Sequence, residues 1–305
     1  MDSKISFDIL LERFFFYRHY LRADTKRSYN NIIRIIKKRY PNLNANDVTT
    51  DMLIEWRNQV VGNTIKAVTW NNYVRHLKAL YNFAIAQGLL CMSSNPFNHL
   101  FIRESRRKKK TYSSEQLHKI DYILHNNIIL PSFLKPSWFI LAIIMTLRST
   151  GIRRGQLVKL KIGDVSLSNR TIYISPEINK NHDYHIVPIS DSLYPHIERL
   201  IQELKIHKQT DDCQLFNLNL FSRYTRRKGQ PMSQNQLTHI FRHISDLVGF
   251  TSSPHRFRHT VATQLMKKPE NVYVVKKLLG HKDISVTLGY IEYDVEMLRD
   301  TVNLL

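Results

Sequence analysis

Two stretches near the C-terminus carry two imidazoles, a guanidinium and a phenol at defined spacing. His255 and Arg258 lie in the sequence PHRFRHT, and His281 and Tyr290 follow after apolar, helix-like segments. A phosphoryl-transfer transition state spreads negative charge over several oxygen atoms, and a planar guanidinium matches that charge with paired hydrogen bonds. The combination predicts an attack on a phosphodiester.

Tyr290 is the candidate nucleophile of this set. A free phenol has a pKa of about 10, so attack at neutral pH requires a proton acceptor and nearby cations. His255 is the candidate acceptor, and His281 could hydrogen-bond the phosphate. Tyr293, one helical turn further on, is a rival nucleophile.

Two further groups must come from upstream. Arg153 follows a Thr-Gly turn at the predicted start of a helix, where backbone N–H groups also favour an anion. The departing sugar oxygen needs a general acid, and Lys180 is the best candidate because it lies at the tip of a predicted hairpin, residues 179–183. Each residue alone is typical of an ordinary surface, so the prediction depends on the combination.

The same sequence does not favour metal or nucleotide chemistry. A two-metal nuclease needs clustered carboxylates, but Asp164, Glu177 and Asp183 are scattered. The chain has nine glycines and no glycine-rich phosphate loop. We therefore expect no metal and no other cofactor.

Residues 1–100 predict an all-helical domain. Helical patterns cover residues 6–20, a segment from Thr25 to Pro41, and residues 65–87, and Thr50 is the expected N-cap of a further short helix. Polar and basic side chains on the outer faces make a DNA clamp plausible, with ordinary solvated helix faces as the alternative. The candidate DNA contacts are Lys26, Arg27, Arg34, Asn72, Arg75 and Lys78.

Residues 101–112 predict a basic linker between two domains. Six cations and one acid occur in the eight residues 103–110. Such a run could follow a DNA backbone by counterion release, or it could be a solvated tether. Its candidate DNA contacts are Arg106, Arg107, Lys108, Lys109 and Lys110.

Residues 113–305 predict a mixed, mostly helical domain that carries all the candidate catalytic groups. A capping-box signature at Ser113–Gln116 starts it, and a buried helix is expected over residues 138–147. Residues 171–174 and 185–189 are β-type runs that flank the hairpin tip, and helices resume over 193–206 and 233–247. The fold class is therefore mainly α with one small antiparallel sheet.

The overall charge indicates a polyanionic partner. Lys and Arg number 45 against 25 Asp and Glu, which gives a net charge of +20 and a pI of about 9.9. Nucleic acid is favoured over an anionic membrane, because no basic amphipathic segment with a lipid anchor is found. Without a signal-peptide pattern and with two cysteines, a reducing cytoplasm is expected, with both thiols as packing residues.

Taken together, these motifs resemble the tyrosine site-specific recombinases, the family of phage integrases and bacterial chromosome-dimer resolution recombinases. The first arginine box is matched by Thr150–Arg153 with Leu157, Leu160 and Asp164, the hairpin lysine by Asn179–Asn181 before Ile186–Ile189, and the His-x-x-Arg box by His255–Thr260. The closing histidine and nucleophile motifs are matched by Leu278–His281 and Thr287–Tyr290. The N-terminal helices with Asn95–Phe97 resemble the family's core-binding (SAM-like) domain.

The resemblance implies a role for each residue. Arg153 and Arg258 would clamp the scissile phosphate, and Lys180 would protonate the leaving 5′-oxygen. His255 would assist proton transfer, His281 would donate to a phosphate oxygen, and Tyr290 would form a 3′-phosphotyrosine.

The implied partner is a double-stranded DNA recombination site, held by a homotetramer on two duplexes that exchange strands through a Holliday junction. A partner recombinase or a directionality factor could join this assembly. The implied setting is bacterial or phage-encoded, cytoplasmic and nucleoid-associated. The apolar residues 295–305 are expected to pack on a neighbouring protomer.

The chain departs from the family pattern at Gln156, where members often carry an acidic residue. It also starts at the core-binding helices, which favours two domains without an arm-site-binding domain. A type IB topoisomerase and a catalytically silent DNA-binding protein on the same scaffold are the alternative functions. Asn95–Phe97 and the paired domains disfavour the first, and the complete set of candidate residues disfavours the second.

Overall fold

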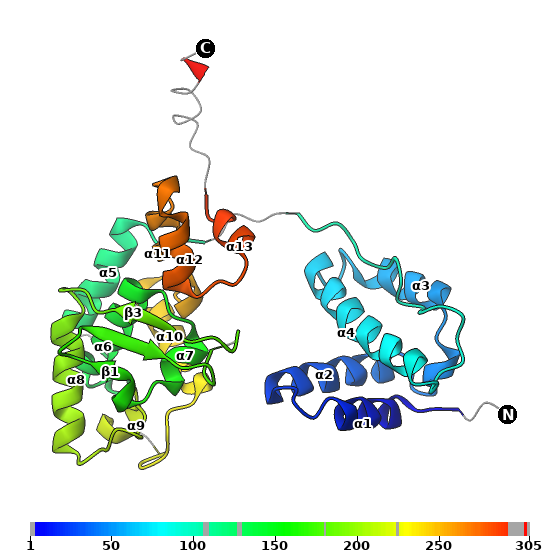
Figure 1. Ribbon diagram of the computed structural model, residues 1–305, viewed down its shortest axis with the longest axis horizontal. Coiled ribbons are helices and arrows are strands. Elements are labelled where there is room, and N and C mark those ends of the chain that lie inside the picture. Colours follow the sequence, from blue (N-terminus) through cyan, green and yellow to red (C-terminus); the bar gives the residue numbers. More distant parts are fainter. Residues whose placement is uncertain are drawn as a thin grey trace. The chain divides into compact units, whose positions relative to one another are not determined.

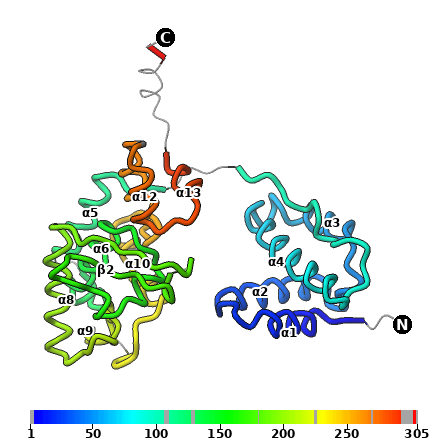
Figure 2. The backbone as a smooth tube through the Cα atoms, in the orientation of Figure 1, coloured from blue at the N-terminus to red at the C-terminus, as the bar shows by residue number. Residues whose placement is uncertain are grey.

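The computed structural model describes residues 4–105, 110–126, 130–179, 181–223, 226–291 and 302–303. The chain divides into two compact units, Met1–Arg107 and Lys108–Leu305, which are described separately (Figures 1 and 2). Lys180, Arg106, Arg107, Lys108 and Lys109 lie outside the described residues, as does most of the C-terminal segment predicted to contact a neighbouring protomer.

The first unit is all-helical. Its elements are α1 (Phe7–Tyr17), α2 (Ala23–Arg39), η1 (Ala45–Asp47), α3 (Thr50–Val60) and α4 (Ala67–Ala86). Helices α1, α2 and α4 pack on one another around a core rich in aromatic side chains. Phe14 is central to this core, since its ring contacts both Tyr29 and Phe83 at centroid distances of 4.9 and 5.3 Å.

The N-cap of α3 differs from the sequence prediction. It is Thr49, whose hydroxyl accepts from the Met52 N–H, so Thr50 is the first helical residue. On α4, Val68 is exposed, whereas Asn71 is buried. The Asn71 amide bonds both the N–H and the carbonyl of Ile102, which ties the start of the predicted linker to this unit.

The second unit is built around one buried helix. Its helices are α5 (Ser114–His125), η2 (Ser132–Leu134), α6 (Ser137–Thr150), α7 (Arg154–Lys159), η3 (Ile162–Asp164), α8 (Tyr194–Ile206), α9 (Leu218–Phe221), α10 (Gln234–Val248), α11 (Pro254–Leu265), η4 (Pro269–Asn271), α12 (Val272–Leu279) and α13 (Ile284–Leu288). Helix α6 packs against α5, α8 and α11, and nine of its 14 residues are buried. The predicted capping box forms at the start of α5, where Ser113 and Gln116 bond reciprocally.

A three-stranded antiparallel sheet accompanies these helices. Strand β2 (Thr171–Ile174) pairs with β3 (His185–Pro188) as predicted, and β1 (Val165–Ser166) adds an edge strand that the sequence pattern did not reveal. The register places Ile174 opposite His185, so the segment between β2 and β3 extends beyond the ladder. The predicted fold class, mainly α with a small antiparallel sheet, is confirmed.

The prediction that both thiols are packing residues is wrong for Cys91, which is exposed, whereas Cys213 packs against the core of the second unit. Between α8 and α10, the short helix α9 forms and Leu215 and Phe216 lie in the core.

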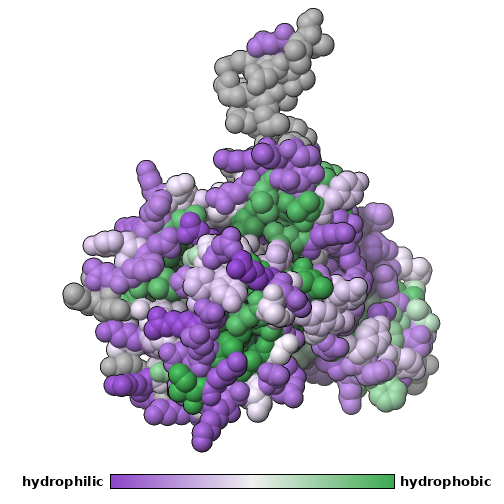
Figure 3. Space-filling model, turned by 60° about the vertical axis from the view of Figure 1, so that its left-hand side comes forward, coloured by the Kyte–Doolittle hydropathy of each residue, from purple (hydrophilic) through white to green (hydrophobic). Residues whose placement is uncertain are grey.

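Hydrophilic side chains cover most of the molecular face in Figure 3, with several apolar patches between them. Within the described ranges, none of the helices combines the length and the apolar character needed to cross a membrane.

The packing around α6 gives a first testable prediction. Phe139→Ala removes a ring with 0% exposure, so the free energy of unfolding should fall by about 3–5 kcal/mol. Tyr122→Ala on α5, where the side chain is 65% exposed, is the matched control and should change it by less than about 1 kcal/mol. Urea denaturation followed by tryptophan fluorescence measures both, and equal effects would contradict the assignment of α6 as the core helix.

Candidate active site

Arg258 lies at the centre of the candidate site. Its side chain is buried in α11, with 5% of the residue exposed. One terminal nitrogen donates to the Gly151 carbonyl at 2.9 Å, and the other donates to the Leu279 carbonyl at 2.8 Å and to His281 Nε2 at 2.8 Å. Burial, with a further contribution from Arg153, lowers the pKa of Arg258 to about 10. The guanidinium therefore remains charged at neutral pH.

Two helix ends supply the carbonyls that hold Arg258. Gly151 ends α6 and Gly280 ends α12, each with a left-handed backbone (φ +61° and +60°) that glycine adopts without strain. A Cβ atom at Gly151 would also lie 2.8 Å from the Leu279 side chain. Three helices, α6, α11 and α12, thus meet at the guanidinium.

His281 has a defined hydrogen-bonding state at this junction. Since a guanidinium can only donate, His281 Nε2 must accept from Arg258. We therefore assign the proton to Nδ1, which donates to the hydroxyl of Thr287 at 2.9 Å. Thr287 is fully buried in α13, so the helix fixes the plane of the imidazole.

Tyr290 follows α13 and turns its phenol into the same site. The residue is 6% exposed, and its ring is stacked on that of His281, with an interplanar angle of 7° and a centroid distance of 6.2 Å. Its hydroxyl lies 3.1 Å from His259 Nδ1. Burial raises the pKa of Tyr290, whereas the Arg258 charge, a hydrogen bond from Arg258 and the Arg153 charge act to lower it.

Arg153 is the N-cap of α7 and is half-buried. Its backbone N–H donates to Gln156 Oε1 at 2.8 Å, and its guanidinium reaches Asn179 Oδ1 and the Gly280 carbonyl, both at 3.5 Å. Burial lowers the pKa of Arg153, and the nearby Tyr290 acts to raise it. Among the described ion pairs, none includes Arg153 or Arg258.

Gln156 joins Arg153 to the β2–β3 connection. Its side chain is buried, and while Oε1 accepts from Arg153, Nε2 donates to Asn179 Oδ1 at 3.3 Å. Asn179 is buried as well and donates to the Asp183 carbonyl at 2.6 Å. The amide at position 156 thus makes a donor contact that a carboxylate could not make.

Two further histidines face the guanidinium groups. His255, at the start of α11, is exposed, and its pKa is lowered by partial burial and by the charges of Arg154, Arg258 and Arg153. Burial, followed by the charges of Arg153 and Arg258, lowers the pKa of His185 to about 4. Both imidazoles are therefore neutral at pH 7.

The structure brings together five of the six predicted catalytic residues: Arg153, His255, Arg258, His281 and Tyr290. The sixth, Lys180, and the rival nucleophile Tyr293 lie outside the described residues. The neighbours of Lys180 in sequence are held at the site, because Asn179 contacts Arg153 and Asn181 donates to the Gly280 carbonyl at 2.9 Å.

The candidate DNA contacts of the first unit lie on α2 and α4, where all are exposed or half-buried. Lys26 lies over the ring of Phe15, and Arg27 forms an exposed ion pair with Asp24. Lys110, the described member of the basic linker set, is exposed in the second unit.

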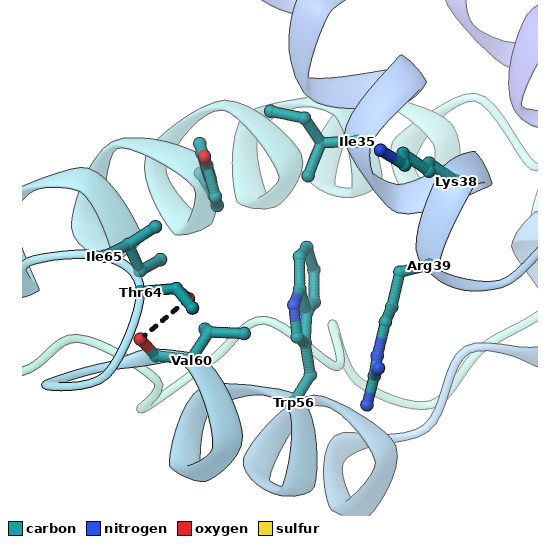
Figure 4. A pocket seen from close by; sticks show the side chains of 8 residues that line it. Ile35, Lys38, Arg39, Trp56, Val60, Thr64 and Ile65 are labelled. Atoms are coloured by element: carbon teal, nitrogen blue, oxygen red, sulfur yellow. Dashed lines mark hydrogen bonds between the residues drawn. The ribbon is translucent and has the colours of Figure 1, made fainter.

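A separate pocket of about 500 Å³ lies within the first unit (Figure 4). Trp56 stands at its centre, with Lys38 and Arg39 on one side and Val60 and Ile65 on the other. Its lining residues all belong to the first unit, so none of them is a candidate catalytic residue of the second unit. Where side chains are described, no three His, Cys, Asp or Glu side chains cluster in a way that could hold a metal ion.

Comparison with known proteins agrees with this geometry. Residues 132–297, more than half of the chain, match the model of the phage integrase family. A putative tyrosine recombinase XerC of Pseudomonas aeruginosa is 33% identical over 294 residues, which cover 93% of this chain and 68% of that protein. The chain belongs to the phage integrase family. This identifies it as a tyrosine recombinase.

A second relative and a solved structure extend the comparison for this phage integrase family member. A putative tyrosine recombinase XerC of Pseudomonas syringae is 30% identical over 292 residues, 93% of this chain and 61% of that protein. The solved structure is the Tn1549 transposon integrase in complex with circular intermediate DNA. It has a TM-score of 0.75 at 21% identity and covers 98% of this chain and 99% of that one, which establishes the shared fold.

The fold of this integrase family member places several further groups at the site, beyond the predicted catalytic residues. His259 touches the phenol, His185 faces both arginines, and Thr287 orients His281. A signal for His259 was available, because residues 255, 258 and 259 share one face of a helix. His185 and Thr287 carried no local signal, since tertiary packing alone brings them there.

The Gln156 contacts yield a prediction on stability. Gln156→Glu keeps an acceptor for the Arg153 N–H but places a carboxylate against Asn179 Oδ1, so the free energy of unfolding at pH 7 should fall by about 1–3 kcal/mol. Gln202→Glu, at an exposed position of α8, is the matched control and should be nearly neutral. Urea denaturation gives both values, and a Gln156→Glu protein as stable as the control would contradict the buried amide contact.

The environment of His185 yields a prediction on pH. Its pKa of about 4 lies below the ordinary value of about 6.5. The unfolded chain therefore binds the proton more readily, and the stability from neutral His185 is lost as pH falls from about 6.5 towards 4. NMR should show an imidazole signal, absent from His185→Gln, that does not titrate between pH 7.5 and 5. Titration near pH 6.5 would show that His185 is not buried beside the arginines.

Proposed function

We propose that this chain catalyses site-specific recombination of double-stranded DNA through a covalent 3′-phosphotyrosine, without metal or ATP. The observation that carries the proposal is a buried phenol, that of Tyr290, beside two guanidinium groups that have no carboxylate partner among the described residues. Uncompensated positive charge of this kind attracts a phosphodiester and stabilises the charge that develops on it during attack.

The residues would divide the chemistry as follows. Arg153 and Arg258 hold the non-bridging oxygens of the scissile phosphate, and Tyr290 attacks the phosphorus. Lys180 protonates the 5′-oxygen as it leaves, since an alkoxide is a poor leaving group. His281 donates to a phosphate oxygen through Nε2 when that nitrogen carries the proton. His255 assists proton transfer from its position near both arginines.

Strand exchange is possible because the phosphotyrosine keeps the bond energy of the phosphodiester that was cleaved. The phosphotyrosine retains the phosphodiester, so the 5′-hydroxyl of a second strand can attack it and release Tyr290 without an external energy source. Exchange of both strands between two duplexes requires four cleavages. With one nucleophile in each chain, we infer a tetramer that acts through a Holliday junction, with or without a partner recombinase or a directionality factor.

The first unit would act as the DNA clamp. Exposed or half-buried Lys26, Arg27, Arg34, Arg75 and Lys78 can contact phosphates, as can the basic run 106–110. Asn72 on α4 would join them. With a net charge of +20, binding should weaken steeply as salt increases. The setting that we infer is the bacterial or phage-infected cytoplasm, with the chain bound to the nucleoid.

A trapping experiment tests the proposal. The full chain is incubated with duplexes of randomised sequence that carry one nick, so that the short leaving strand diffuses away and a covalent adduct accumulates. The adduct is recovered under denaturing conditions and sequenced, which also defines the target. We expect the wild type and Tyr293→Phe to form the adduct, Tyr290→Phe to form none, and EDTA to have no effect.

Other outcomes would be decisive as well. An adduct that survives in Tyr290→Phe would overturn the assignment of the nucleophile, and inhibition by EDTA would indicate a metal mechanism. If the wild type binds DNA but forms no adduct, the chain is a silent DNA-binding protein. Relaxation of supercoiled plasmid by the monomer without strand exchange would indicate the type IB topoisomerase function.

A further inference from the structure

His259 is the imidazole that contacts the phenol of Tyr290. Its Nδ1 lies 3.1 Å from the phenolic oxygen, and the two ring centroids are 5.6 Å apart. The residue follows Arg258 on α11, so the helix that holds the buried guanidinium also holds this imidazole. Tyr290 itself is buried, which favours a fixed contact over a chance one.

The direction of this hydrogen bond follows from the chemistry of the two groups. A phenol carries one O–H, and the Nδ1 of a neutral imidazole can accept it. The charge of Arg258 acts on the same phenol and favours the loss of its hydrogen. We assign the O–H of Tyr290 as donor to His259 Nδ1, with the imidazole neutral and its proton on Nε2.

We propose that His259 is the catalytic base that takes the proton of Tyr290 when the phenol attacks the phosphate. The proposal rests on the proposed function and deepens it. His255, which the sequence favours as the acceptor, has no described hydrogen bond to the phenol. It lies close enough to Arg154, Arg258 and Arg153 for their positive charges to act on its imidazole. His255 is thereby assigned to the phosphate side of the site and His259 to the nucleophile side.

The step balances in bonds and protons. A bond forms between the Tyr290 oxygen and phosphorus, and the bond from phosphorus to the 5′-oxygen breaks. The phenol proton moves to His259 Nδ1, which becomes an imidazolium, while the leaving oxygen takes its proton from a separate acid, Lys180 in the proposed function. In the reverse step the incoming 5′-hydroxyl attacks phosphorus, and the His259 imidazolium returns its proton to the departing Tyr290 oxygen.

Kinetics of adduct formation on the nicked duplex recovered above test this assignment. The variants of the full chain are His259→Ala, His259→Asn and His255→Ala. Asparagine can place an acceptor where Nδ1 lies but cannot hold a transferred proton, so it separates positioning from catalysis. We expect His259→Ala and His259→Asn to slow adduct formation by about 10²–10⁴-fold, and added imidazole to restore part of the rate of His259→Ala but not of Tyr290→Phe.

A pH profile completes the test. The rate of His259→Ala should rise with pH, because ionisation of the phenol replaces transfer to the base, whereas the wild-type rate should level off. Wild-type rates in His259→Asn would overturn the proposal and leave His259 as a positioning residue. Imidazole rescue of His255→Ala, with His259→Ala unimpaired, would assign the base to His255. If the wild type itself forms no adduct, the proposed function fails together with the base, whereas normal cleavage by His259→Ala removes the base alone.

Discussion

The arrangement of helices at the site depends on the burial of one guanidinium group, that of Arg258. Arg258 stays charged at neutral pH and is almost inaccessible to water, so every hydrogen it directs inward needs an acceptor. The carbonyls of Gly151 and Leu279 and the ring of His281 meet that need. Gly151 ends α6, and Leu279 and His281 lie at the end of α12 and in the turn after it, so α6 and α12 converge on the guanidinium that α11 carries.

These neutral acceptors leave the positive charge uncompensated. A carboxylate beside Arg258 would neutralise it and weaken its attraction for a phosphate. The described ion pairs include neither Arg153 nor Arg258. The pKa values of His185 and His255 are lowered, so these two imidazoles add no further charge at neutral pH. The arrangement favours an anion between the arginines, and the charges of Arg258 and Arg153 also act to lower the pKa of Tyr290.

The sequence predicted those features of the fold that depend on contacts between residues close together in the chain. It did not predict features that depend on contacts between distant residues. Periodicity and capping predicted α6 and the capping box of α5, because both depend on local contacts. Local rules could not show that Asn71 is buried, since its partner is the backbone 31 residues away at Ile102. The edge strand β1 was too short to show alternation.

The residues of the candidate site also divide into those that lie in a sequence motif and those that tertiary packing alone places there. Five residues with a recognisable motif come together, because motif spacing reflects a chemical requirement. His185 and Thr287 are placed by tertiary packing and have no motif of their own. His259 lay within a motif, but only the position of the phenol reveals its contact. Gln156 departs from the family pattern, and its contact with Asn179 provides a physical reason for an amide there.

We propose that the Tyr290 phenol becomes covalently joined to a DNA 3′-phosphate. Mass spectrometry of the trapped adduct, after nuclease trimming and proteolysis, tests this proposal. We expect a single modified peptide in which Tyr290 carries a nucleotide linked through its 3′-phosphate. A nucleotide on Tyr293 or on any other residue, or one linked through its 5′-phosphate, would contradict it.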